Sequence, residues 1–189
     1  MPIALIRNAV VWRVFQVMQH AARETLQVCC PFSLGFHIGG SRLESFAVKH
    51  IVEEQGPLVS ILKTVRKQPY SLTSKEHEAR LAARGCNIYV IEVIVELTQR
   101  IYRLGYRYRA WECYEGAGGA PWKERFKFKN AAKPGPSEGI YFDRPIVIAD
   151  PDFNGWYKGE TLGMTEIPEK HVAVLERLIA DPVNNALPF

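Results

Sequence analysis

The stretch Asn87–Leu97 reads NIYVIEVIVEL, and its dense Ile, Val and Tyr content predicts a β-strand. Before it, Lys75–Ala83 contains alanines and charged residues and follows Thr73 and Ser74, either of which is a favourable helix N-cap. We therefore expect a strand end over Pro69–Ser74, a helix over Lys75–Ala83 and a strand over Asn87–Leu97. These three elements form the centre of the predicted fold.

Further out, strands and helices follow one another in no regular order. Short apolar runs predict strands over Ala9–Phe15 and Ile140–Ile148, and helical spacing predicts helices over Arg42–Glu53, N-capped by Ser41, and over Glu169–Ala180. The polar, aromatic stretch Asp150–Gly159 is expected to be a loop. Because strands and helices do not alternate as βαβ units, the pattern predicts an α+β fold.

The chain has 189 residues, a length that suits one domain, since domains typically have about 100–150 residues. The apolar fraction of 47% and the charged fraction of 23% are those of an ordinary globular protein. The net charge of +4 is concentrated in Arg100–Lys133, which holds nine Lys or Arg and three Glu. Such local basicity favours a docking surface over general coating by nucleic acid.

No apolar stretch approaches the roughly 20 residues that span a bilayer, so no membrane span is expected. Arg7 and Arg13 interrupt the apolar start of the chain, and no small-residue cleavage site follows, so no signal peptide is predicted. The four cysteines contain no CxxC pair, which favours free thiols in a reducing cytoplasm over a disulfide framework or a metal site.

Three short segments carry residue types suited to breaking the nicotinamide bond of NAD. They are Val11–Val14 (VWRV), Tyr70–Ser74 (YSLTS), and Gly159-Glu160 followed by Ile167-Pro168. The arginine side chain has a fixed fork that binds phosphate in a bidentate way. A carboxylate stabilises the positive charge that develops on a sugar carbon when its leaving group departs.

In their order and spacing the three segments resemble the mono-ADP-ribosyltransferase toxins of the cholera and pertussis (Arg-Ser-Glu) type. Trp12-Arg13 is similar to the aromatic–arginine pair that ends the first strand of that family. Thr73-Ser74 is similar to the end of its Ser-Thr-Ser motif, with Leu72 in place of the first serine. Glu160 precedes Ile167-Pro168 at the spacing of the family's catalytic glutamate.

The resemblance implies a split, bent β-sheet core with flanking helices, formed by one domain over residues 1–189 with a basic insertion at about 97–138. It implies NAD as substrate, transfer of ADP-ribose to a macromolecule, release of nicotinamide, and no metal. Glu160 would be the catalytic carboxylate, Arg13 would anchor NAD, and Thr73 and Ser74 would shape its pocket. The implied substrate-recognition residues are those of an exposed loop: Phe153, Trp156, Tyr157 and Lys158.

The partners implied are a macromolecular acceptor, protein rather than nucleic acid, and an immunity or chaperone protein. Such a toxin or effector would be cytoplasmic where it is made and delivered from there into a target cell. Lys158 stands where the family often has Glu or Gln, two residues before the catalytic glutamate. This departure leaves open both the type of acceptor and the hydrolysis of NAD without any acceptor.

Other interpretations remain open. Residues 152–175 resemble the second half of an SH3 domain, a peptide-binding module in which Trp156 would line the groove. Asp150 begins a weak EF-hand pattern that lacks the final glutamate. His37 with Tyr141 would suit a histidine-type ADP-ribosyltransferase. The tyrosines and arginines of Tyr102–Trp111 suit nucleic-acid binding less well than a twisted strand pair with solvated basic faces.

Overall fold

The computed structural model describes residues 44–116, 126–160 and 163–189. The chain divides into two compact units, Met1–Gly40 and Ser41–Phe189, and every described residue belongs to the second. The predicted strand Ala9–Phe15, Arg13 within it and His37 therefore lie outside the described residues.

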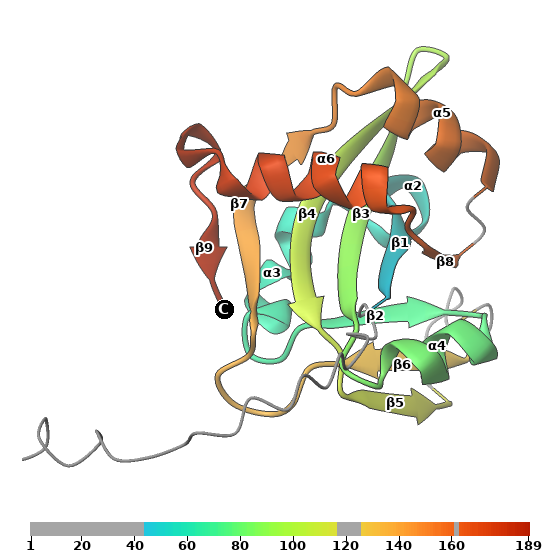
Figure 1. Ribbon diagram of the computed structural model, residues 1–189, viewed down its shortest axis with the longest axis vertical. Helices are drawn as coiled ribbons and strands as arrows, with labels where there is room; N and C mark the ends of the chain where they lie inside the picture. Colours follow the sequence, from blue (N-terminus) through green and yellow to red (C-terminus); the bar gives the residue numbers. More distant parts are fainter. Residues whose placement is uncertain (1–43, 117–125, 161–162) are drawn as a thin grey trace, which may run out of the picture. The chain divides into compact units, whose positions relative to one another are not determined.

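Six strands form the main sheet, in the order β8-β1-β3-β4-β7-β9 (Figure 1). They are β1 (Ser45–Ile51), β3 (Asn87–Glu96), β4 (Gln99–Arg109), β7 (Gly139–Val147), β8 (Met164–Glu166) and β9 (Leu187–Pro188). β1 and β3 run parallel, and the other neighbouring pairs run antiparallel. Within the described residues β8 pairs with Phe46–Val48, and the Lys49 N–H donates to the Gly163 carbonyl at 3.4 Å.

A second sheet has the order β2-β6-β5, with strands β2 (Tyr70–Thr73), β6 (Phe128–Ala131) and β5 (Glu112–Glu115). Helix α4 (Glu76–Ala82) packs on it, and the Asn130 amide donates to the Ala79 carbonyl at 2.6 Å. The two sheets are joined where the Ser71 hydroxyl of β2 meets the Tyr108 hydroxyl of β4 at 2.8 Å. Both partners are buried, so this bond fixes β2 against the main sheet.

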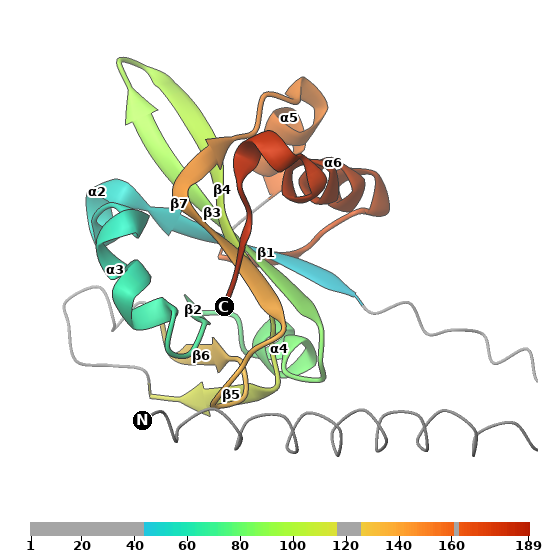
Figure 2. The same cartoon turned by 90° about the vertical axis from the view of Figure 1, so that its left-hand side faces the viewer.

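Helices cover both faces of the main sheet (Figure 2). Helices α5 (Pro151–Glu160) and α6 (Glu169–Ala180) lie on one face, and α2 (Val52–Gln55) and α3 (Leu58–Val65) on the other. Successive side chains of a strand point to opposite faces of the sheet, so the main sheet has one hydrophobic core on each face. Ala47, Tyr89 and Ile91 lie in the core beneath α5 and α6. Phe46, Val48 and Val90 lie in the core shared with α3 and the second sheet. A short 3-10 helix, Pro182–Asn184, leads into β9.

A buried ion pair attaches α3 to the main sheet. The Glu92 carboxylate, 1% exposed, accepts from the Leu58 backbone N–H at 2.9 Å and lies 2.8 Å from the Arg103 guanidinium. Because Leu58 is the first residue of α3, the carboxylate also lies at the positive end of the helix dipole. The interactions of Glu92 on β3 and Arg103 on β4 therefore fix the position of α3 and of Ile61 on it.

The α+β class is confirmed for the described residues. The expected helices Lys75–Ala83 and Glu169–Ala180 correspond to α4 and α6, and the expected strands Asn87–Leu97 and Ile140–Ile148 correspond to β3 and β7. The strand end expected over Pro69–Ser74 is β2.

The helix expected over Arg42–Glu53 is wrong, because Ser45–Ile51 is the strand β1. Its parallel ladder to β3 runs from Ser45 opposite Asn87 to Ile51 opposite Val93. Both faces of β1 are covered, so apolar residues occupy consecutive positions and the strand lacks the alternation that identifies a half-buried one.

The loop expected over Asp150–Gly159 is also wrong, because Pro151–Glu160 is the helix α5. The Asp150 carboxylate accepts from the Phe153 N–H at 2.8 Å, as an N-cap does, and Pro151 follows it at the start of the helix. This helix also overturns two alternatives. An SH3 domain is a β-barrel, whereas 152–175 is mostly helix, and an EF-hand requires a loop where α5 lies.

The basic stretch at 97–138 is integral to both sheets. It supplies β4, which lies between β3 and β7, and both β5 and β6 of the second sheet. The preferred interpretation of Tyr102–Trp111 as part of a twisted strand pair is confirmed by the β3–β4 ladder. Its basic faces are not simply solvated, however, since Arg103, Arg107 and Arg109 pair with Glu92, Glu176 and Glu138 respectively.

Candidate functional site

Two hollows lie beside the C-terminal half of β1. The first, called here the charged groove, has about 1250 Å³ of atom-free space that is open to solvent. It is lined by Lys49, Ile51, Glu53, Glu54, Ser74, Lys75, Val93, Val95, Arg100, Tyr102, Phe126 and Gly163. Three basic side chains from three different segments therefore surround one groove, together with two glutamates of α2.

At the charged groove, Gly163, which lies between Glu160 and Ile167 in the chain, is close to Thr73 and Ser74. A methyl group built on Gly163 would lie 3.4 Å from Thr73 Oγ1 and 3.9 Å from Ser74 Oγ. The Gly163 carbonyl also accepts from the Lys49 backbone N–H at 3.4 Å. The residue three positions after Glu160 thus lies close to the Thr73-Ser74 turn, although about 90 residues separate them in the chain.

Thr73 and Ser74 have different surroundings. Thr73 is buried, and its hydroxyl accepts from the Lys75 N–H at 3.1 Å, which fixes the turn into α4. Ser74 is exposed and lines the groove. Of the pair expected to shape an NAD pocket, Thr73 is therefore buried in the turn, and Ser74 is exposed in the groove.

Two cations of the charged groove, Lys49 and Arg100, lie near enough to affect one another. Burial lowers the pKa of the Lys49 ammonium, and the nearby Arg100 guanidinium lowers it further. Lys49 Nζ lies 5.1 Å from the centroid of the Tyr157 ring. Tyr102, 3% exposed, lines the groove, and its hydroxyl makes no hydrogen bond within the described part of the chain. An anion in the groove would lower the electrostatic cost of placing Lys49 beside Arg100.

The other expected site residues are distributed along α5. Glu160 is its last residue. Phe153 and Tyr157 are fully buried, so their expected display on a recognition loop is wrong. They lie four residues apart on one helix face and pack into the core beneath α5 and α6. Trp156 is half-buried and stacks on His171 with centroids 4.8 Å apart, and Lys158 is exposed.

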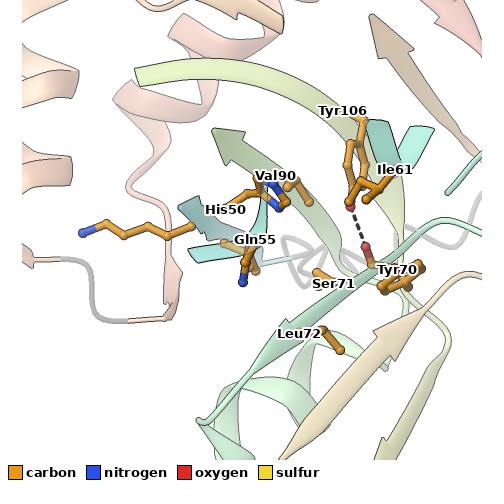
Figure 3. Close-up of a pocket in the computed structure, with 10 residues that line it drawn as sticks. His50, Gln55, Ile61, Tyr70, Ser71, Leu72, Val90 and Tyr106 are labelled. Atoms are coloured by element: carbon orange, nitrogen blue, oxygen red, sulfur yellow. Dashed lines mark hydrogen bonds between the residues drawn. The ribbon is translucent and has the colours of Figure 1, made fainter. Parts of the chain in front are cut away.

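The second hollow, called here the His50 pocket, lies between β1, α3 and β2 (Figure 3). Its cavity volume is about 70 Å³, well below the roughly 300–1,000 Å³ of small-molecule sites. Its lining is Val48, Lys49, His50, Gln55, Ile61, Tyr70, Ser71, Leu72, Val90 and Tyr106. Lys49 and the segment 70–75 contribute to both hollows.

Hydrogen bonds fix the polar groups of the His50 pocket. The Tyr106 hydroxyl donates to the Tyr70 carbonyl at 2.6 Å, the bond dashed in Figure 3. His50 Nε2 lies 2.7 Å from the Gly56 carbonyl, which can only accept, so Nε2 carries the proton. Burial lowers the pKa of His50, against the opposing effects of this bond and of the Glu92 carboxylate. His50 is therefore neutral at pH 7, with Nδ1 as an acceptor.

The sequence interpretation missed Lys49, His50 and Tyr106. The signal for the first two was available, because a lysine and a histidine interrupt the otherwise apolar run that forms β1. Tyr106 was grouped with the basic stretch, although its alternation with Tyr108 places both rings in one core.

The described residues contain no group of three or more His, Cys, Asp or Glu arranged to hold a metal ion. Among the helices that the structure describes, none has the length and apolar character needed to cross a bilayer.

No protein-family model and no curated protein matches the sequence. A solved structure of a hypothetical protein from Leishmania major is similar at 10% identity, with a TM-score of 0.46. The similarity covers 72% of this chain and 94% of that one. A likeness this weak assigns neither a family nor an activity.

Proposed function

We propose that the protein binds NAD along the charged groove and breaks its nicotinamide bond, with Glu160 as the catalytic carboxylate. The observation that carries this proposal is the closeness of Gly163 to Thr73 and Ser74, since a methyl group built on it would lie 3.4 Å from Thr73 Oγ1. It joins the hydroxyl-bearing segment to the segment that follows Glu160, two of the three parts on which the resemblance to ADP-ribosyltransferases rests. Arg13, the third part, lies outside the described residues.

The chemistry of the groove suits the phosphates of NAD. Lys49, Lys75 and Arg100 line it, and a pyrophosphate would offset the repulsion between Lys49 and Arg100. Lys75 also pairs with Glu78 at 3.5 Å. The exposed Ser74 hydroxyl supplies a hydrogen-bond donor at the surface of the groove. A bound phosphate oxygen would accept from it.

In the reaction proposed, the bond between ribose C1′ and the nicotinamide nitrogen breaks as a new bond forms between C1′ and an acceptor oxygen or nitrogen. Glu160 stabilises the positive charge on the ribose in the transition state. With water as acceptor the products are ADP-ribose, nicotinamide and one proton.

The burial of Phe153 and Tyr157 favours water over a macromolecule as the acceptor. In the transferase interpretation these rings meet the acceptor, but here they are fully buried in the core. Transfer to a protein stays the second candidate, and it would use the exposed Lys158 and the half-buried Trp156. The same assay measures both outcomes.

The test is incubation of the purified protein with NAD labelled in its adenylate half. Free nicotinamide, free ADP-ribose and label on added host-cell protein are each quantified. We expect nicotinamide release by the unaltered chain and a loss of roughly 10²–10³-fold in turnover for Glu160→Gln, the usual cost of removing one aimed electrostatic group. Glu115→Gln, an exposed change on β5, should keep full turnover.

Circular dichroism should show that Glu160→Gln keeps the fold. If the unaltered protein releases no nicotinamide, or if the glutamine variant turns over NAD at an unchanged rate, the proposed function is wrong. Label on protein rather than in free ADP-ribose would establish transfer in place of hydrolysis.

A further inference from the structure

A third hollow lies on the face of the main sheet that helix α6 crosses in Figure 1. It is called here the α6 groove and is formed by residues 44–45 and 87–89, Arg107 and residues 166–176. Its cavity volume is about 570 Å³, within the roughly 300–1,000 Å³ of small-molecule sites. None of its residues has a role in the proposed NAD cleavage.

The floor of the α6 groove is polar and comes from three neighbouring strands. Ser45 lies opposite Asn87 in the β1–β3 ladder, and Tyr89 lies opposite Arg107 in the β3–β4 ladder. Because Tyr89 belongs to the core beneath α6 and side chains alternate along a strand, these four side chains lie on the face covered by α6. Arg107 pairs with Glu176 of α6 at 2.8 Å, so a carboxylate already neutralises the guanidinium of the groove.

Ser45 is the residue that points to a ligand. It is 8% exposed, and within the described residues its hydroxyl makes no hydrogen bond. Its backbone carbonyl accepts from the Ile167 N–H at 2.7 Å, which fixes the residue at the groove. A hydroxyl so nearly buried costs free energy when it has no partner, and a bound molecule with a donor group would supply one.

The charge of the α6 groove favours a cation. Against one arginine it is lined by four glutamates, namely Glu44, Glu166, Glu169 and Glu176. These carboxylates come from the start of β1, the end of β8 and two turns of α6, and no three of the described acidic, histidine or cysteine residues are grouped to hold a metal ion. Negative charges distributed in this way suit a flexible molecule with several positive groups better than a single small ion.

One wall of the α6 groove is apolar. Ile167, Pro168 and Val172 form it, beside the acidic residues. Methylene groups gain from burial against such a wall, while the ammonium groups that they connect stay near the carboxylates and water. We propose that the α6 groove binds an aliphatic polyamine, with its ammonium groups at the glutamates and at the Ser45 hydroxyl and its methylene groups along this wall.

The test is calorimetric titration of the full chain with spermidine, with n-butylamine and with acetylated trilysine amide. We expect spermidine to bind with a stoichiometry of one, and butylamine, which has one ammonium group, to bind much more weakly. The trilysine peptide has the same net charge as spermidine at neutral pH, but it is too bulky for the groove and should also bind more weakly. Equal or tighter binding of the peptide would overturn the proposal, because it would indicate general attraction or a peptide site.

Two pairs of variants locate the binding. Val172→Trp fills the groove and should lower the spermidine affinity by roughly tenfold or more. Ala173→Trp places the same ring on the exposed side of α6 and should leave the affinity unchanged. Glu169→Gln should lower the affinity by roughly three- to fivefold, whereas Glu115→Gln, an exposed change on β5, should not alter it.

Ser45→Ala tests the unpartnered hydroxyl and should lower the spermidine affinity by roughly tenfold, the usual effect of losing a hydrogen bond to a charged group. Should Val172→Trp fail to fold by circular dichroism, spermidine-induced shifts of the Asn87 side-chain amide protons in the unaltered chain replace it. No spermidine binding at millimolar concentration would overturn the proposal. Binding that is unchanged by the filled groove, equal losses in the Glu169 and Glu115 variants, or unshifted Asn87 amide protons would overturn it as well.

Discussion

His50 shows how one buried residue links a strand, a turn and a pocket. It is 7% exposed, donates through Nε2 to the Gly56 carbonyl, and lines the hollow between β1 and β2. Protonation would place a charge on a ring with little access to water, and the Glu92 carboxylate compensates only in part. The neutral form is therefore the one that the folded chain stabilises.

This preference predicts the pH dependence of stability. Because burial lowers the pKa of His50 in the folded chain from 6.5, the unfolded chain binds more protons below that pH. Stability then rises with pH through this range, so the free energy of unfolding should fall as pH drops below about 6.5. His50→Gln removes this titration and should flatten the slope between pH 6.5 and 5. Urea titrations at several pH values measure it.

The range from pH 7.5 to 8.5 is the internal control, because His50 is neutral there in both states and the variant should not alter the slope. Burial also lowers the pKa of His171, so the variant should still lose part of its free energy of unfolding at acid pH. An unchanged slope below pH 6.5 after His50→Gln would contradict the prediction.

At the scale of elements, replacing a glycine by alanine should have opposite effects on the free energy of unfolding in β4 and in α5. Gly105 lies where the β4–β7 register shifts, and a methyl group built on it would lie 2.7 Å from a methyl carbon of the fully buried Leu58. Gly105→Ala should therefore lower the free energy of unfolding by about 1–3 kcal/mol, as overpacking does. Gly155 in α5 has nothing within 4 Å, so Gly155→Ala should raise it by about 0.5–1 kcal/mol. Chemical denaturation measures the free energy of unfolding of both variants. A change of the same sign in the two would refute the prediction.

The elements also differ in how far the sequence predicts them. α6 and β3 were predictable because each has one clear sequence pattern. In α6 the apolar residues lie on one helix face, and β3 is a dense run of β-branched residues. α5 contains two glycines and several polar residues, and its helical signal is confined to the Asp150-Pro151 start and to Phe153, Trp156 and Tyr157. Tertiary burial of those rings determines its conformation.

The candidate site was predictable only in part. Residues of Tyr70–Ser74 line both hollows, and Gly163, three residues after Glu160, lies close to Thr73 and Ser74. Lys49, His50 and Tyr106 come from strands that the sequence interpretation assigned to a helix or to a basic insertion. Their convergence depends on the β1–β3–β4 ladders, long-range pairings that no local pattern records.

At the scale of the whole molecule, the division of the chain makes a further prediction. Both cores, both sheets and all lining residues of the His50 pocket belong to the unit Ser41–Phe189. A chain beginning at Ser41 should therefore unfold in one cooperative transition, since it holds a continuous main sheet packed on both faces. Calorimetric melting of the shortened chain measures this. A broad, non-cooperative transition would contradict the prediction and show that residues 1–40 are needed for folding.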